Sequence, residues 1–140
     1  MTTIIDATNT ILGRLATVAA KKALLGEEVI IINAEKAVVS GEKQAVLAHW
    51  RQKYARGVPS KGPFIHRHPD RLIRRVIRGM LPYKTARGQE AYKRIMCYVG
   101  IPEAYAEKET IHLDEATKAK LPNTKYVTML DISKNLGGAQ

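Results

Sequence analysis

Apolar residues in the first forty positions change from the spacing of a strand to that of a helix and back. Residues 2–6 are a short run with a pair of isoleucines, and residues 29–32 are a continuous β-branched run. Such a β-branched run predicts a strand covered on both faces, as in a parallel sheet. Between the two runs, leucine and alanine recur every three or four residues, which predicts a helix over residues 11–25. Strand, helix and strand in this order predict a βαβ unit.

The first predicted helix has two marked ends and one apolar stripe. Thr10 is expected to be its N-cap, because a threonine hydroxyl can accept a hydrogen bond from an unpaired backbone N–H of the first turn. Gly26 follows the last periodic position, as glycine often does at the end of a helix. The residues expected to be buried are Leu12, Leu15, Ala16, Ala19 and Ala23.

The middle of the chain predicts two more helices with a loop between them. Ser40 and Gly41 are expected to cap the first of these helices, which runs to about residue 54. Glycine and proline mark a loop over residues 57–63. A proline, which suits the first turn of a helix, opens the next one over residues 69–80.

Two later apolar runs, residues 95–99 and 126–129, predict strands, which makes four strands, mostly parallel. A short terminal helix is expected to end at Gly137 and Gly138. The sequence contains no internal repeat, low-complexity tract or Ser/Gly linker. One domain over residues 1–140, with an inserted basic region, is therefore expected.

Composition narrows the class of protein. Apolar residues make up 45% of the sequence, an ordinary share for a globular domain with a core. No apolar run approaches the roughly 20 residues of a membrane span, and the N-terminus lacks the pattern of a secretion signal. The single cysteine, Cys97, cannot form an internal disulfide and is expected to be an inert core residue. A cytoplasmic protein without a membrane partner is expected.

The positive charge of the chain is concentrated in one segment. The net charge is +10, which favours a polyanion as partner. The basic segment, residues 51–94, holds nine of the ten arginines and a net charge of +11, so the rest of the chain sums to −1. An anionic partner is therefore expected at the basic segment.

The predicted helix over residues 69–80 separates charged from apolar side chains. At helical spacing one face is apolar, and the other carries Arg71, Arg74, Arg75 and Arg78. A solvated face is the alternative, but such faces usually pair opposite charges at i,i+4, and only Asp70 and Arg74 have that spacing here. Arginine favours phosphate, because its planar guanidinium can donate two hydrogen bonds to one phosphate group.

Basic and aromatic residues on both sides of this helix extend the surface. The flanking cations are Arg51, Lys53, Arg56, Lys61, Arg67, Lys84, Arg87, Lys93 and Arg94. Phe64 and Tyr83 lie in loops between charges, where stacking on an unpaired base and simple packing are both open. For Trp50 and Tyr54, packing against the core is favoured.

His66 and His68 are spaced closely enough to suggest a metal pair, but no third ligand of suitable type lies near them in the sequence. A hydrogen bond to phosphate, to a 2′-hydroxyl or to the backbone is therefore expected instead, with simple packing as the alternative. No metal and no other cofactor are expected.

Sequence signatures of catalysis are missing. There is no glycine-rich dinucleotide fingerprint, no phosphate loop and no serine elbow. The βαβ start keeps a nucleotide-binding enzyme as the second hypothesis, because open parallel sheets place ligands beyond their strand ends. Its candidate anion sites are residues 8–13 and 40–43, which are more simply explained as helix caps. The favoured hypothesis is a basic RNA-binding protein that is not an enzyme and has no small-molecule substrate.

Three segments resemble, in order, those of one known family. Residues 6–16 begin with DAT and contain LGRLA, and residues 29–39 contain INAEK. Residues 78–82 read RGMLP and are followed by a GQ pair and then by residues 95–100. These segments resemble the uL13 family of large-subunit ribosomal proteins, formerly L13.

Further features resemble the archaeal form of that family. They are the short connection at residues 26–28, the segment FIHRHPDR at residues 64–71, and Tyr83 and Lys84 after the proline. Cys97 departs from the family, which more often has an apolar β-former there. The change is small, because buried cysteine behaves as a small hydrophobe.

The resemblance implies a three-layer α/β/α fold around a mostly parallel four-stranded sheet. It also implies a place in the large ribosomal subunit, with large-subunit rRNA and neighbouring ribosomal proteins as partners and a role in subunit assembly. The α/β body is expected to be a platform from which the basic segment binds folded rRNA.

The side chains expected to contact rRNA fall into three groups. The central ones are Arg71, Arg74, Arg75 and Arg78. Secondary contacts are expected from Arg14, Lys84 and Arg87, with weaker expectations for Lys36 and Lys43. The remaining expected contacts are Arg51, Lys53, Arg56, Lys61, Arg67 and His68.

Overall fold

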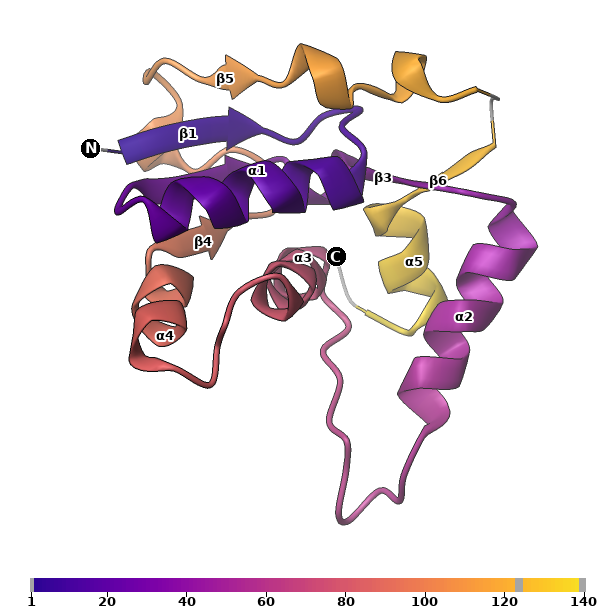
Figure 1. Ribbon diagram of the computed structural model, residues 1–140. Coiled ribbons are helices and arrows are strands. Elements are labelled where there is room, and N and C mark those ends of the chain that lie inside the picture. Colours follow the sequence, from indigo (N-terminus) through magenta and orange to yellow (C-terminus); the bar gives the residue numbers. More distant parts are fainter. Residues whose placement is uncertain (1, 123–124, 139–140) are drawn as a thin grey trace.

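The computed structural model describes residues 2–122 and 125–138 (Figure 1). Its centre is a parallel sheet with the strand order β4 (Ile95–Cys97), β2 (Glu28–Ile32), β1 (Thr2–Asp6) and β5 (Ile111–His112). The α-helices are α1 (Leu12–Leu24), α2 (Lys43–Ala55), α3 (Pro69–Gly79), α4 (Ala86–Lys93) and α5 (Met129–Asn135). The α/β class and the parallel four-stranded sheet expected from the sequence are confirmed.

Helices cover one face of the sheet. Ile5, Ile31 and Ile95 point from three neighbouring strands into a core that they share with α1 and α3. The whole apolar stripe predicted for the first helix is buried there. α1 also contacts α3 and α4, so the helices that carry the basic segment rest directly on the βαβ unit.

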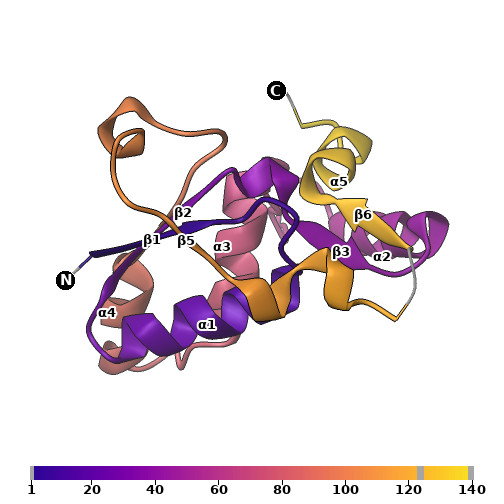
Figure 2. The same ribbon diagram turned by 90° about the horizontal axis from the view of Figure 1, so that it is seen from above.

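The opposite face of the sheet has a thinner cover. Its buried side chains are Ile4, Ile30 and Ile32, on which Tyr98 and Tyr105 pack. The two tyrosines belong to the segment 98–110, which contains one 3-10 turn, η2 (Glu103–Tyr105). Figure 2 shows this segment on the other side of the sheet from α1 and α4. The third layer is therefore a loop with a single helical turn.

The N-terminus of α1 differs from the expectation. Its N-cap position is Ile11, and no side chain caps it, so the assignment of Thr10 as N-cap is wrong. Thr10 is buried, and its hydroxyl donates to the carbonyl oxygen of Thr8 at 3.2 Å. The carbonyl oxygen of Thr10 accepts a hydrogen bond from the backbone N–H of Val38. Pairing with the strand at Val38 therefore sets the conformation of Thr10. At the other end of α1, Gly26 has a φ of +98°, as expected for the residue after a helix.

A second, two-stranded sheet lies beside the parallel one and was not expected. β3 (Val38–Ser40) pairs antiparallel with β6 (Tyr126–Thr128), whereas the sequence interpretation had placed residues 126–129 in the main sheet. The fourth parallel strand is instead β5. Because Ser40 pairs within β3, it does not cap α2. The N-cap of α2 is Glu42, without a side-chain hydrogen bond, so the cap predicted at Ser40 and Gly41 is wrong.

α4 is a short helix that the apolar pattern did not predict. The Thr85 hydroxyl caps it by accepting a hydrogen bond from the backbone N–H of Gly88 at 3.3 Å. Gly88 is buried, and a Cβ atom there would overlap the backbone carbonyl of Pro82. The turn that follows α3 therefore packs directly on the first turn of α4.

Candidate nucleic-acid interface

α3 carries the arginine face predicted from the sequence. Pro69 stands in its first turn, where proline is favourable because a backbone N–H at this position would have no partner within the helix. Leu72, Ile73 and Ile77 on the apolar side of the helix are buried, which fixes its rotation and turns the opposite side outward. On that side Arg71 and Arg75 are exposed, whereas Arg74 and Arg78 are half-buried.

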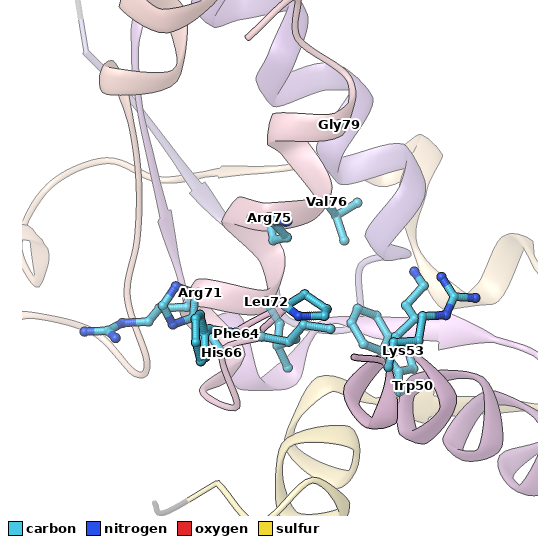
Figure 3. A pocket seen from close by; sticks show the side chains of 12 residues that line it. Trp50, Lys53, Phe64, His66, Arg71, Leu72, Arg75, Val76 and Gly79 are labelled. Carbon is cyan, nitrogen blue, oxygen red and sulfur yellow. The ribbon is translucent and has the colours of Figure 1, made fainter. Parts of the chain in front are cut away.

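A groove of about 480 Å³ opens between α2, the connecting loop and the outer side of α3 (Figure 3). Figure 3 shows Trp50 and Lys53 of α2 on one side of this α2–α3 groove, and Arg71 of α3 on the other. Arg56 and Arg75 also line it, so four cationic side chains meet here. Among the described residues that line the groove there is no carboxylate.

Two further hollows continue the α2–α3 groove along α3. A hollow of about 430 Å³ shares His66, Arg71 and Arg75 with the groove. The next, of about 530 Å³, shares Arg78 and Tyr92 with the second and extends to Gln89 and Lys93 of α4. Together they form one basic surface that runs from α2 past α3 to α4.

The chain neutralises little of this charge internally. Over residues 2–122 and 125–138, the salt bridge found is Lys22 to Glu27, with an N–O distance of 3.6 Å, and it lies outside the basic segment. Asp70 and Arg74 have the spacing of a helical pair but form no salt bridge. The cations around α3 are therefore left for an outside anion or for backbone groups.

Arg74 binds the protein's own backbone. Its Nε atom donates to the carbonyl oxygen of Ile95 at 3.0 Å, and a terminal nitrogen donates to that of Tyr92 at 3.3 Å. Its guanidinium also lies over the Tyr92 ring, 4.3 Å from the centroid. Arg74 therefore ties α3 to the end of α4 and the start of β4.

Three other predicted contacts lie over aromatic rings of the chain. Arg78 lies 4.2 Å from the centroid of Tyr83, and Arg67 lies 4.4 Å from that of Tyr54. The Lys53 amine is 5.0 Å from the Trp50 ring. These rings orient the cations, and each ring has one face covered by the protein itself.

Two predicted contacts are engaged elsewhere. Arg14 donates to the carbonyl oxygen of Glu115 at 3.1 Å and lines a separate hollow near residues 112–116. Arg51 donates to the side-chain oxygen of Asn135 at 2.6 Å, which joins α2 to the end of α5. The structure does not bring Arg14 or Arg51 into the α2–α3 groove.

Lys36 and Lys43, outside the basic segment, are exposed. The remaining predicted contacts are exposed side chains spread over the basic segment. They are Arg56, Lys61, His68, Lys84 and Arg87. Arg56 lines the α2–α3 groove, and Lys84 lines the hollow next to α4. His68 occupies the N-cap position of α3 without a side-chain hydrogen bond to the helix.

Three residues that the sequence analysis discussed without assigning them as rRNA contacts also line these hollows. Phe64 and His66 lie in the loop before α3, and Lys93 ends α4. The sequence carried a signal for Phe64, an aromatic residue between cations in a Gly- and Pro-rich stretch. Lys93 was identified only as a flanking cation, and its position on a helix was not predicted, because α4 lacks an apolar stripe.

The loop after β1, a candidate anion site in the enzyme hypothesis, is a self-contained hydrogen-bonded turn. The Asp6 carboxylate accepts hydrogen bonds from the backbone N–H and hydroxyl of Thr8 and from the Asn33 amide. Burial pushes the pKa of Asp6 upward, but these hydrogen bonds and nearby His112 outweigh it, so the pKa lies below its usual value. A carboxylate that stays ionised at this position disfavours an anionic ligand.

The second candidate anion site and the cysteine also lack features of catalysis. Glu42 occupies the N-cap position of α2, so a negatively charged residue adjoins the helix N-terminus, where an anion would bind. Burial raises the pKa of Cys97 to about 12, which keeps its thiol protonated and unreactive.

In the described residues, no three His, Cys, Asp or Glu side chains gather as metal ligands. No helix in that part of the chain has the length and apolar character to cross a bilayer.

Known proteins match this chain along most of its length. Residues 1–104 match the ribosomal protein L13 family. The large ribosomal subunit protein uL13 of Methanopyrus kandleri is 49% identical over 139 residues, covering 96% of this chain and 86% of that protein. The proteins of the same name from Archaeoglobus fulgidus and Methanococcoides burtonii are 44% and 46% identical. Each covers 96% of this chain, and the matches span 87% and 97% of those proteins.

These matches include the sheet and α1 as well as the basic segment, so the resemblance first noted in three short segments is confirmed. The family is one of structural ribosomal proteins, which agrees with the expectation that the chain is not an enzyme. The chain belongs to the ribosomal protein L13 family, in its archaeal form.

Proposed function

We propose that this chain is a constituent of the large ribosomal subunit in the cytoplasm, where its basic segment binds large-subunit rRNA and supports subunit assembly. Residues 1–140 act as one ribosomal-protein domain, in which the sheet and α1 hold residues 51–94 in place. Neighbouring ribosomal proteins are further partners. The names of the archaeal relatives, which are large ribosomal subunit proteins, support this assignment.

The α2–α3 groove is the observation that carries the proposal. Lys53, Arg56, Arg71 and Arg75 converge on one hollow without a carboxylate among its described lining residues. Such a cluster repels itself in isolation, and phosphate groups relieve the repulsion while counterions are released from the RNA.

The contacts of each side chain divide the predicted set into two roles. Arg71 and Arg75 are exposed, so we assign them direct phosphate contacts, together with Arg56, Lys61, Lys84 and Arg87. Arg74 is committed to backbone carbonyls, so we assign it to positioning α3 against α4. Arg67 and Arg78 lie over tyrosine rings and keep an edge toward the surface for RNA.

A salt series with purified chain and large-subunit rRNA tests the proposal, with an equally long unrelated structured RNA as competitor. We expect a preference for the large-subunit rRNA that survives competitor. The double variant Arg71→Gln/Arg75→Gln is expected to flatten the slope of log K against log salt by roughly 1.4 to 1.8, because two phosphate contacts are lost.

A matched control separates local contacts from total charge. The double variant Lys21→Gln/Lys120→Gln removes the same charge from two exposed positions outside the basic segment. It is expected to bind nearly as well as the wild type. Equal affinity and slope for the Arg71→Gln/Arg75→Gln variant and the wild type, with both folded, would overturn the assignment of the α2–α3 groove.

A further inference from the structure

The α2–α3 groove has an apolar floor, which phosphate binding alone does not require. Leu72 is buried beneath the groove, and Trp50, Ile65 and Val76 are half-buried at its sides. The cations stand around these residues and would suffice for phosphate groups. An apolar floor inside a basic rim instead fits a ligand that combines a flat apolar group with a negative charge.

Phe64 stands in this groove with 74% of its surface exposed (Figure 3). Its neighbour Ile65 packs against the core, whereas Phe64 lies outside the core cluster. A ring with this exposure contributes little to the core, and it stands inside a basic groove with an apolar floor rather than alone on the surface.

The other aromatic rings of the basic segment are each covered by a cation of the chain. The pairs are Tyr54 with Arg67, Tyr83 with Arg78 and Tyr92 with Arg74. Within the part of the chain that the structure describes, the Phe64 ring has no cation or ring partner. Phe64 is therefore available to stack on a ring from outside.

We infer that the α2–α3 groove binds a single unpaired nucleotide of the RNA, with its base stacked on Phe64 and its two flanking phosphates at Arg71 and Arg75. The inference rests on the proposed RNA-binding function and names the element of the RNA that this site takes. The groove volume of about 480 Å³ lies in the range of small-ligand sites, about 300–1,000 Å³. Because every base has a flat face, the site selects an unpaired base over a paired one rather than a particular sequence.

Binding of the full chain to large-subunit rRNA across a salt series gives the first test. Phe64→Leu keeps an apolar side chain but removes the ring, so we expect binding about tenfold weaker at every salt concentration. The salt slope is expected to stay unchanged, because the substitution removes no charge. Phe64→Tyr retains a ring and is expected to bind like the wild type.

Trp50 provides a direct readout, because it is the only tryptophan of the chain and it lines the same groove. A base that enters the groove is expected to quench its emission when RNA saturates the wild type. At saturating RNA, Phe64→Leu is expected to show less quenching. Val58→Ala, at an exposed apolar residue of the same loop, is the control and is expected to leave affinity and quenching unchanged.

The outcomes separate this inference from the proposed function. If Phe64→Leu binds large-subunit rRNA with wild-type affinity and wild-type quenching, the nucleotide site is overturned, while RNA binding by the arginines stands. If the wild type shows no preference for large-subunit rRNA over the competitor, the proposed function itself is overturned. Weaker binding with an unchanged slope, restored in Phe64→Tyr, supports the site.

Discussion

At the junction between α3 and α4, arginine side chains bind other groups of the protein, whereas in the α2–α3 groove the arginines of α3 do not. At the junction, Arg74 donates to two backbone carbonyls; nearby, Arg94 at the end of α4 donates to the carbonyl oxygen of Ala23 at the end of α1. In the groove, Arg71 and Arg75 have no hydrogen-bond, ion-pair or ring partner among the residues that the structure describes. Arginines of the same helix therefore have different roles: Arg74 stabilises the fold, and Arg71 and Arg75 remain available to a partner.

This difference teaches that arginine density overstates the number of RNA contacts. A guanidinium has five N–H donors and a flat face, so it can bridge a carbonyl, a ring and a helix as readily as it binds phosphate. At the α3–α4 junction these contacts connect α3, α4 and β4, whereas in the groove the arginine side chains are exposed to solvent. Substitutions at the α3–α4 junction are expected to lower the free energy of unfolding, and substitutions in the groove are expected to lower the affinity for RNA.

The largest effect is expected for Gly88→Ala at the α3–α4 junction. A methyl group at Gly88 would overlap the backbone carbonyl of Pro82, which cannot move without shifting the turn after α3. We expect the free energy of unfolding to fall by about 3 kcal/mol, measured by urea denaturation.

The control for this substitution is Gly79→Ala at the end of α3. A Cβ atom at Gly79 would meet nothing within 4 Å, and its φ is not in the left-handed region. We expect unchanged or slightly higher stability, because alanine is the better helix former. Equal loss of stability in both variants would show that the α3–α4 junction is not tightly packed.

The next effect compares Arg74→Met with Arg75→Met, two neighbours on α3. Methionine keeps an unbranched apolar stem but removes the guanidinium. Arg74→Met loses hydrogen bonds to the carbonyl oxygens of Ile95 and Tyr92, so we expect the free energy of unfolding to fall by about 2 kcal/mol. Arg75→Met is expected to change it by less than about 0.5 kcal/mol. Equal stabilities for the two variants in urea would remove the distinction between the regions.

Apart from the control substitutions, the smallest loss of stability is expected for Arg78→Met, between the two regions. Arg78 is half-buried and lies over the Tyr83 ring, with no backbone acceptor in the described structure. We expect a loss of about 0.5 kcal/mol in the free energy of unfolding, the size of an exposed cation–π contact. In a double-mutant cycle with Tyr83→Leu, a coupling energy of zero would contradict a stabilising contact.

The elements of the βαβ start were predictable because their patterns are long and regular. The β-branched run at residues 29–32 and the apolar stripe of α1 are both buried as expected. β5 was not predictable, because two residues, both exposed, carry no periodic signal. Assigning residues 126–129 to the main sheet failed for a related reason: so short an apolar run shows that a strand is present but does not show which strand it pairs with.

The arginine face of α3 was predictable, but the partner of each arginine was not. The amphipathic pattern identified all four arginines, and the structure confirms that the apolar side is buried. The sequence does not show that Arg74, rather than Arg75, binds backbone carbonyls, because those carbonyls belong to the end of α4, a helix without an apolar stripe, and to the start of β4. The two predicted caps failed because strand pairing at Val38 and Ser40 competes for the same backbone. Tertiary contacts therefore determine the partner of each arginine and the ends of these helices, which local sequence preferences do not reveal.

The strand order also sets the order in which the chain can fold. β2 and β4 are neighbours in the sheet, yet the whole basic segment lies between them in the sequence. Parallel pairing over such separations is slow compared with local contacts, because a long loop must close first. During synthesis, which starts at the N-terminus, the arginine-rich helix α3 is therefore made before β4 and β5. Only these later strands can pair with the outer edges of β2 and β1. Until then, both edges of the β1–β2 pair remain open to other chains.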